Sequence, residues 1–169
     1  VSELNRRELP IPKENLGTLH SLAFHALGRP KIAETGPLMK EFSEAHPSYE
    51  ITDATRDGIE DGYANGGKSE GSRLLAEYSR LRALMRPRDL WPARVTDFAG
   101  AWESYKNDIH ARDFSDLIED CVKEELSPSC DAAVGFFDEV QDFTPLELSL
   151  VRLWGKHLEK IVLVGDADQ

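Results

Sequence analysis

Two short apolar runs near the C-terminal end of the sequence constrain its fold more than any other feature. Residues 132–137 (AAVGFF) and 161–164 (IVLV) show no alternation of polar and apolar positions, a pattern typical of strands buried on both faces. Between them, Thr144 and Glu147 frame a capping box (TPLE) with proline at the first helical position, which predicts a helix through about Trp154. A strand, a helix and a second strand in succession predict a βαβ unit with two parallel strands.

The residues before these runs favour helices. Apolar side chains recur at helical spacing in four stretches, residues 16–27, 72–85, 96–109 and 113–125. Thr18 is a candidate N-cap for the first of them. Residues 31–45 have a helical pattern that Gly36 and Pro37 are expected to break, and the glycine-rich residues 46–71 are expected to form a loop. The predicted fold class is therefore α/β, with a mostly helical segment before a parallel-sheet segment.

Length and composition exclude several classes of protein. The chain has 169 residues, and it contains neither an apolar stretch long enough to span a membrane nor a signal-peptide pattern. Two cysteines, Cys121 and Cys130, are too few for a disulfide-built scaffold or a four-cysteine zinc site, so we expect reduced thiols in a cytoplasmic protein. The sequence begins without Met and ends at the first turn after a strand-like run, and we interpret it as part of a longer protein.

Charge is distributed unevenly along the chain. The net charge of −11 argues against a nucleic-acid-binding protein with a uniformly basic face. Residues 66–94, however, carry seven basic and three acidic side chains, whereas residues 41–65 carry one basic and seven acidic ones. The expected helix 72–85 therefore lies in a locally basic segment. It either contacts an anionic partner or presents ordinary solvated charges.

Acidic and amide side chains follow both strand-like runs. Asp138, Glu139 and Asp142 come after the first run, and residues 165–169 (GDADQ) come after the second. Ligands of open parallel sheets bind beyond the carboxyl ends of the strands. Three carboxylates at one place repel each other unless a cation such as Mg²⁺ lies among them. Asp138 would then be the ligand of the cation. Glu139 could take a proton from water, and Gln169 could reach a phosphate oxygen. Alternatively, the acidic residues only favour the N-terminus of the following helix.

Four motifs resemble those of one enzyme family. Residues 136–142 (FFDEVQD) resemble the Walker B motif, D-E-x-Q-D, of UvrD/Rep-like superfamily 1 DNA helicases, and residues 164–169 (VGDADQ) resemble their next motif, G-D-x-x-Q. Residues 17–24 (GTLHSLAF) resemble the T-x-H motif, which contacts single-stranded DNA in that family. Residues 113–118 (DFSDLI) resemble the D-F-x-D-L segment that precedes Walker B. The motifs occur in the order of the family.

The resemblance implies a fold and an activity. The fold would be part of a RecA-like parallel-sheet P-loop NTPase domain, formed by residues 1–34 and 129–169, with a mostly helical, 1B-like insertion at residues 35–128. The activity would be that of the N-terminal motor segment of an ATP-dependent DNA helicase or translocase. Such an enzyme couples ATP hydrolysis to movement along single-stranded DNA and to unwinding of duplex DNA, with ATP and Mg²⁺ as its cofactors.

The resemblance also implies roles for individual residues. Asp138 would coordinate Mg²⁺, Glu139 would be the general base and Gln169 would sense the γ-phosphate, with Gln141 and Asp142 beside the nucleotide. Thr18 and His20 would contact DNA, although Thr18 has a rival role as an N-cap and His20 as a surface side chain of a helix. We expect three arginines of the basic helix to contact DNA phosphates: Arg73, Arg80 and Arg82. The alternative is that they pair with acidic segments of the same fold.

The phosphate-binding loop is the main departure from the family. In the family this loop precedes the T-x-H motif, but nothing before Thr18 resembles it. Residues 62–69 (GYANGGKS) match the pattern G-x-x-x-x-G-K-[ST], yet no apolar strand-like run precedes them, so we interpret them as a flexible loop. Two alternatives stay open: a self-contained P-loop NTPase that uses residues 62–69, and a non-catalytic DNA- or protein-binding module.

Overall fold

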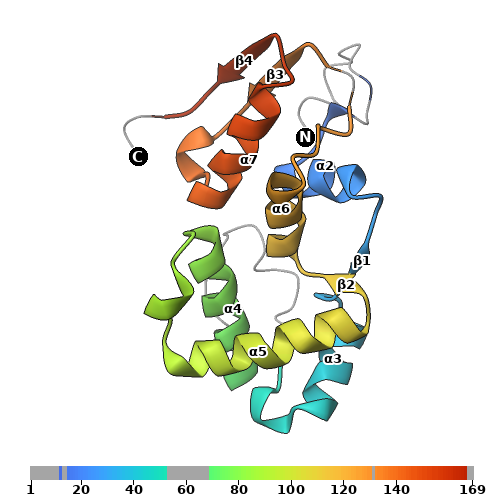
Figure 1. Ribbon diagram of the computed structural model, residues 1–169, viewed down its shortest axis with the longest axis vertical. Coiled ribbons are helices and arrows are strands. Elements are labelled where there is room, and N and C mark those ends of the chain that lie inside the picture. The colour runs from blue at the N-terminus through green and yellow to red at the C-terminus, as the bar shows by residue number, and fades with distance from the viewer. Residues whose placement is uncertain (1–11, 13–14, 53–68, 131, 167–169) are drawn as a thin grey trace. The chain divides into compact units, whose positions relative to one another are not determined.

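The chain folds into two compact units of α/β structure (Figure 1). The computed structural model describes residue 12 and residues 15–52, 69–130 and 132–166. The inserted unit is Lys31–Ser115, and the discontinuous unit combines Val1–Pro30 with Asp116–Gln169. The first boundary lies close to the expected one after residue 34, but the second lies before residue 116 rather than after residue 128. Within the described part of the chain, no helix is long and apolar enough to span a membrane.

A parallel βαβ unit forms the C-terminal part of the discontinuous unit. Strands β3 (Val134–Phe137) and β4 (Lys160–Leu163) pair in parallel, and helix α7 (Pro145–Gly155) connects them (Figure 1). The predicted capping box is present, because Thr144 and Glu147 each bond the backbone of the other and Pro145 occupies the first turn. The parallel pairing and the start of α7 therefore confirm what the sequence predicts for this region.

The expectation that both strands are buried on both faces is wrong in the described structure. The side chain of Ile161 packs against Gly155 of α7, and Leu158 packs against Gly135, which is the register partner of Ile161. That face is therefore covered near Gly135 and Ile161, whereas Leu163 on the same face is 57% exposed. Phe136 points to the other face, and it is 75% exposed. An unalternating apolar run signals strands that favour burial, but it does not state which segment covers each face.

Helices α2 (Leu19–Ala26) and α6 (Phe114–Lys123) belong with this βαβ unit in the discontinuous unit, apart from the start of α6. The thiol of Cys121 donates to the carbonyl of Ala23 at 3.7 Å, and both residues are buried. Burial raises the pKa of Cys121 to about 11, so it stays a protonated thiol at neutral pH. The contact between Cys121 and Ala23 links α6 to α2, and the boundary between the units falls in the first turn of α6.

The inserted unit is mostly helical. Its helices are α3 (Gly36–Ala45), α4 (Glu70–Ala83) and α5 (Ala93–Asp108), with the 3-10 turns η2 (Pro47–Tyr49) and η4 (Arg88–Leu90) and the short parallel strands β1 (Lys31–Ile32) and β2 (Ala111–Arg112). Gly36 and Pro37 begin α3 instead of breaking a helix, because proline is well tolerated in a first turn. Helix α5 begins three residues before Thr96, whose hydroxyl donates to the carbonyl of Pro92 within the first turn.

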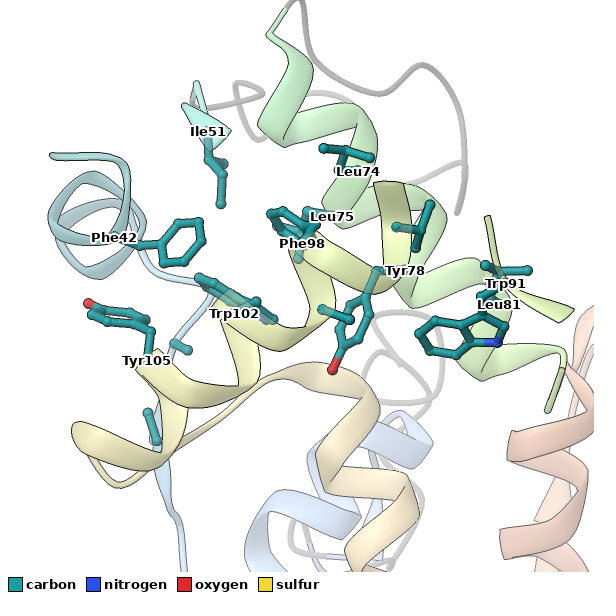
Figure 2. Close-up of a cluster of buried hydrophobic side chains, with 14 residues drawn as sticks. Phe42, Ile51, Leu74, Leu75, Tyr78, Leu81, Trp91, Phe98, Trp102 and Tyr105 are labelled. Atoms are coloured by element: carbon teal, nitrogen blue, oxygen red, sulfur yellow. The ribbon is translucent and has the colours of Figure 1, made fainter. Parts of the chain in front are cut away.

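Aromatic side chains form the core of the inserted unit (Figure 2). Phe42 of α3 meets Trp102 of α5 edge to face, with ring centroids 4.9 Å apart, and Tyr105 lies beside both. Tyr78 of α4 contacts Phe98 of α5 in the same manner. Such pairs add to the free energy of burial. This core holds α4 against α5 and fixes which side chains of α4 face the interior.

Candidate functional site

The chain makes an unusual turn where it leaves β3. Asp138 follows the strand directly, and its Oδ1 accepts the backbone N–H of Glu139 at 3.1 Å. Glu139 has a φ of 53°, in the left-handed region, and the 3-10 turn η5 (Val140–Asp142) follows. The other described non-glycine residues with positive φ all lie just beyond helix C-terminal ends: Arg29, Met85, His110 and Glu125. Glu139 instead holds this conformation after a strand, in the segment that resembles Walker B. Residues held in such conformations cluster at functional sites.

Gln141 joins the ends of the two strands. Its Nε2 donates to Glu139 Oε2 at 2.6 Å, and its Oε1 accepts the backbone N–H of Asp166, which follows β4, at 3.1 Å. The backbone N–H of Val140 also donates to the carbonyl of Val164 at 3.0 Å. The two motif segments therefore lie against each other, as the carboxyl ends of parallel strands should. The sequence predicts that the segments meet, but it does not identify Gln141 as the bridge.

Gly165 makes room for this bridge. A Cβ at this position would lie 2.5 Å from Gln141 Oε1, closer than a real Cβ contact allows. Any larger residue at this position would therefore require the Gln141 amide to move from where it bonds Asp166. Gly165 is the sequence signal that, in hindsight, points to Gln141.

Replacing Gly165 with alanine is expected to push the Gln141 amide away from Asp166 and to destabilise the chain by about 0.5–1.5 kcal/mol, the usual net contribution of one hydrogen bond, because the atom that must move is the end of a flexible side chain at an exposed position. Urea unfolding followed by circular dichroism measures the loss. The matched control is Gly100→Ala in α5, where an added Cβ meets no atom within 4 Å. That variant should gain about 0.5–1 kcal/mol from helix propensity. Equal effects of the two substitutions would contradict the bridging role of Gln141.

The carboxylates at this end of the sheet are exposed, and they do not converge. Asp138, Glu139, Asp142 and Asp166 are all exposed to solvent. Among the described residues, no three His, Cys, Asp or Glu side chains are arranged to hold a metal ion by themselves. Mg²⁺ commonly needs only one or two protein carboxylates when substrate phosphates supply further oxygens. The donor set at Asp138 therefore fits Mg²⁺ that arrives with a nucleotide. Gln169 and residues 62–69 lie outside the described residues.

The two residues predicted to contact DNA lie at the start of α2. Thr18 is the N-cap, since its hydroxyl oxygen accepts the backbone N–H of Ser21 at 3.2 Å. Its predicted role as an N-cap is thus confirmed, and its side chain is exposed. His20 is half-buried, and its Nδ1 lies 3.9 Å from Glu147 Oε1 at the start of α7. Burial lowers the pKa of His20 below its ordinary value and outweighs the opposing effect of Glu147, so the ring is mostly neutral at pH 7.

The prediction that Arg82 contacts DNA is wrong. Its side chain is buried, and its Nη1 donates to both oxygens of Asp113 at 3.0 Å and to the hydroxyl of Tyr78 at 2.7 Å. A guanidinium held in this way does not reach a phosphate. Arg80 is exposed and makes two hydrogen bonds to Glu77, which lower the pKa of that carboxyl.

Asp113 is the centre of a buried ion-pair cluster that the sequence does not predict. Besides Arg82, its carboxylate accepts the indole N–H of Trp102 at 3.2 Å and the ammonium of Lys106 at 2.5 Å. Asp113, Lys106 and Arg82 are all buried. Asp113 begins the segment that resembles D-F-x-D-L, and in this fold its side chain holds α4, α5 and the start of α6 together. No local signal in the sequence identifies its partners.

Comparisons with protein-family models, curated proteins and solved structures find no match to this chain. The functional argument therefore depends on the motifs and on the geometry of the described residues.

Proposed function

We propose that this chain is the N-terminal motor segment of an ATP-dependent DNA helicase or translocase of the UvrD/Rep-like superfamily 1. Its discontinuous unit would then be part of a RecA-like P-loop NTPase domain, and its inserted unit would correspond to the 1B-like subdomain. One observation carries the proposal. The parallel pair β3 and β4 brings the D-E-x-Q-D and G-D segments to one end of a sheet, where Gln141 bonds Glu139 and the backbone of Asp166.

The proposed nucleotide chemistry uses exposed side chains in this turn. Asp138 would hold the Mg²⁺ of Mg–ATP, and Glu139 would accept a proton from the attacking water. Phosphoryl transfer depends mainly on positioning and on neutralisation of charge, so a carboxylate held in place beside the metal would be one of its required parts. The bond from Gln141 to Glu139 Oε2 supports such a fixed carboxylate. Gln141, Asp142 and Gln169 would lie beside the nucleotide.

The proposed nucleic-acid contacts lie at the start of α2 and on α4. Thr18 and His20 would contact single-stranded DNA, and exposed Arg73 and Arg80 would contact backbone phosphates of single-stranded or duplex DNA. Arg82 is not part of this proposal.

ATP hydrolysis with Mg²⁺, measured with and without single-stranded DNA, tests the proposal. The natural polypeptide that contains these residues should hydrolyse ATP faster when DNA is present. These 169 residues by themselves should stay far below the enzyme median of about 10 s⁻¹, because we assign the phosphate-binding loop to a segment other than residues 62–69. Turnover near that median that disappears on Lys68→Ala would instead favour a self-contained P-loop NTPase. DNA binding without hydrolysis in the natural polypeptide would favour a binding module.

A further inference from the structure

The two carboxylate oxygens of Glu147 face different groups. Its Oε2 accepts the backbone N–H of Thr144 at 2.9 Å and the hydroxyl of Thr144 at 2.8 Å, which closes the capping box of α7. Its other oxygen, Oε1, lies 3.9 Å from His20 Nδ1. This distance is too long for a hydrogen bond, but it is short enough for attraction between opposite charges. The group that starts α7 therefore also faces the first turn of α2.

The capping box is connected directly to the turn after β3. Thr144 follows Phe143, whose backbone N–H donates to the carbonyl of Val140 in η5 at 3.2 Å, and the N–H of Asp142 donates to the carbonyl of Glu139 at 2.9 Å. Glu147 is therefore linked to Glu139 through Thr144 and this short hydrogen-bonded turn.

The neutral imidazole of His20 cannot donate hydrogen bonds to two anions at the same time. A neutral ring has one N–H donor and one acceptor nitrogen. If Nε2 donates to a phosphate, Nδ1 presents a lone pair towards Glu147 Oε1, and the two repel each other. Both nitrogens donate only in the imidazolium form. The titratable side chain that faces the ring from α7 is Glu147, and the next one along α2 is His25.

We propose that His20 and Glu147 form a positioning pair that couples phosphate binding at the start of α2 to the acidic turn after β3. The pair rests on the proposed function, since the phosphate is that of a single-stranded nucleic acid. When a phosphate oxygen meets Nε2, the ring takes one proton from solvent and a new N–H bond forms. The imidazolium then draws Glu147 Oε1 into a charge-assisted hydrogen bond. Glu147 must shift relative to Thr144, and the cap passes that shift to the turn that holds Glu139.

The experiment measures binding of a fluorescein-labelled oligothymidylate to these 169 residues by anisotropy at low salt, between pH 5.5 and 8.5. Uptake of one proton on binding should strengthen the affinity by up to about tenfold for each unit by which the pH falls between the pKa values of the free and the bound state. Glu147→Gln and His20→Gln should both flatten this dependence. The matched control is His25→Gln, which changes an exposed histidine of the same helix and should keep the wild-type slope.

A second readout separates coupling from simple binding. In the wild-type chain, oligothymidylate should shift the amide resonance of Thr144. It should also raise the pKa of His20, which is measured from the ring-proton resonance of that residue. In Glu147→Gln the oligothymidylate should bind without shifting the Thr144 amide. A pH slope that persists in His20→Gln, or that disappears in His25→Gln, would overturn the coupling and leave the proposed function standing. Failure of the oligothymidylate to bind at any pH would overturn both.

Discussion

Replacing Asp113 with alanine is expected to destabilise the inserted unit by about 3–5 kcal/mol, the usual cost of removing one partner from a buried ion pair. The substitution removes the buried carboxylate that both buried cations, Arg82 and Lys106, contact, and Trp102 loses the acceptor for its indole N–H. The hydroxyl of Tyr78 still accepts from Arg82, but it carries no charge to replace the carboxylate. Because whole domains are stable by only about 5–15 kcal/mol, this loss brings the unit close to unfolding at room temperature.

Urea unfolding followed by tryptophan fluorescence measures this loss. Asp113→Asn is the milder variant, because it removes the charge and keeps an oxygen that accepts the Trp102 indole. The matched control is Glu70→Ala, which removes an exposed carboxylate bonded to Arg94 at 2.6 Å. Exposed pairs contribute about 0–1 kcal/mol. If Asp113→Ala and Glu70→Ala had the same effect, the three charged groups would not act as a buried cluster.

The cluster also explains which part of the fold could not be predicted from sequence. Helical spacing identifies the helix that contains Arg82, but the long side chain of an arginine can extend either to solvent or along the apolar side of a helix. Its direction is decided by Asp113, which lies 31 residues away in the sequence. Arg82 lies one turn after Tyr78 and follows it into the interior. The spacing of residues within one helix therefore cannot predict a partner this far away in the sequence.

Local rules succeed where the determining contacts are local. The capping box of α7 requires only Thr144 and Glu147, and both bonds are present. The parallel pairing of β3 and β4 follows from the connection through α7, and it brings together the segments that follow the two strands, although it does not identify Gln141 as the residue that bonds Asp166. The exposed face around Phe136 is the opposite case. Which segment covers an apolar strand depends on the rest of the chain. The composition of the strand therefore predicts that its side chains favour burial, but not which segment buries them.

Replacing Glu139 with glutamine is expected to reduce ATP turnover by the natural polypeptide by about 10²–10⁴-fold, the usual contribution of a general base. The amide retains the shape of the side chain and a hydrogen-bond acceptor for Gln141, which now donates to Glu139 Oε2 at 2.6 Å. It does not accept the proton of an attacking water at neutral pH. The loss should therefore fall on kcat, whereas the affinity for Mg–ATP should stay near that of the wild type.

The matched control for Glu139→Gln is Glu159→Gln, which neutralises an exposed carboxylate just before β4, at the amino end of the strands. Both substitutions change the net charge by the same amount, so a general electrostatic effect on a polyanionic substrate would appear in both. Steady-state hydrolysis gives kcat, and binding of a fluorescent ATP analogue with Mg²⁺ gives the affinity. Wild-type turnover in Glu139→Gln would mean that the carboxylate is not the base. Its left-handed turn and its bond to Gln141 would then serve only to lead the chain from β3 into α7, with the acidic residues favouring the helix N-terminus.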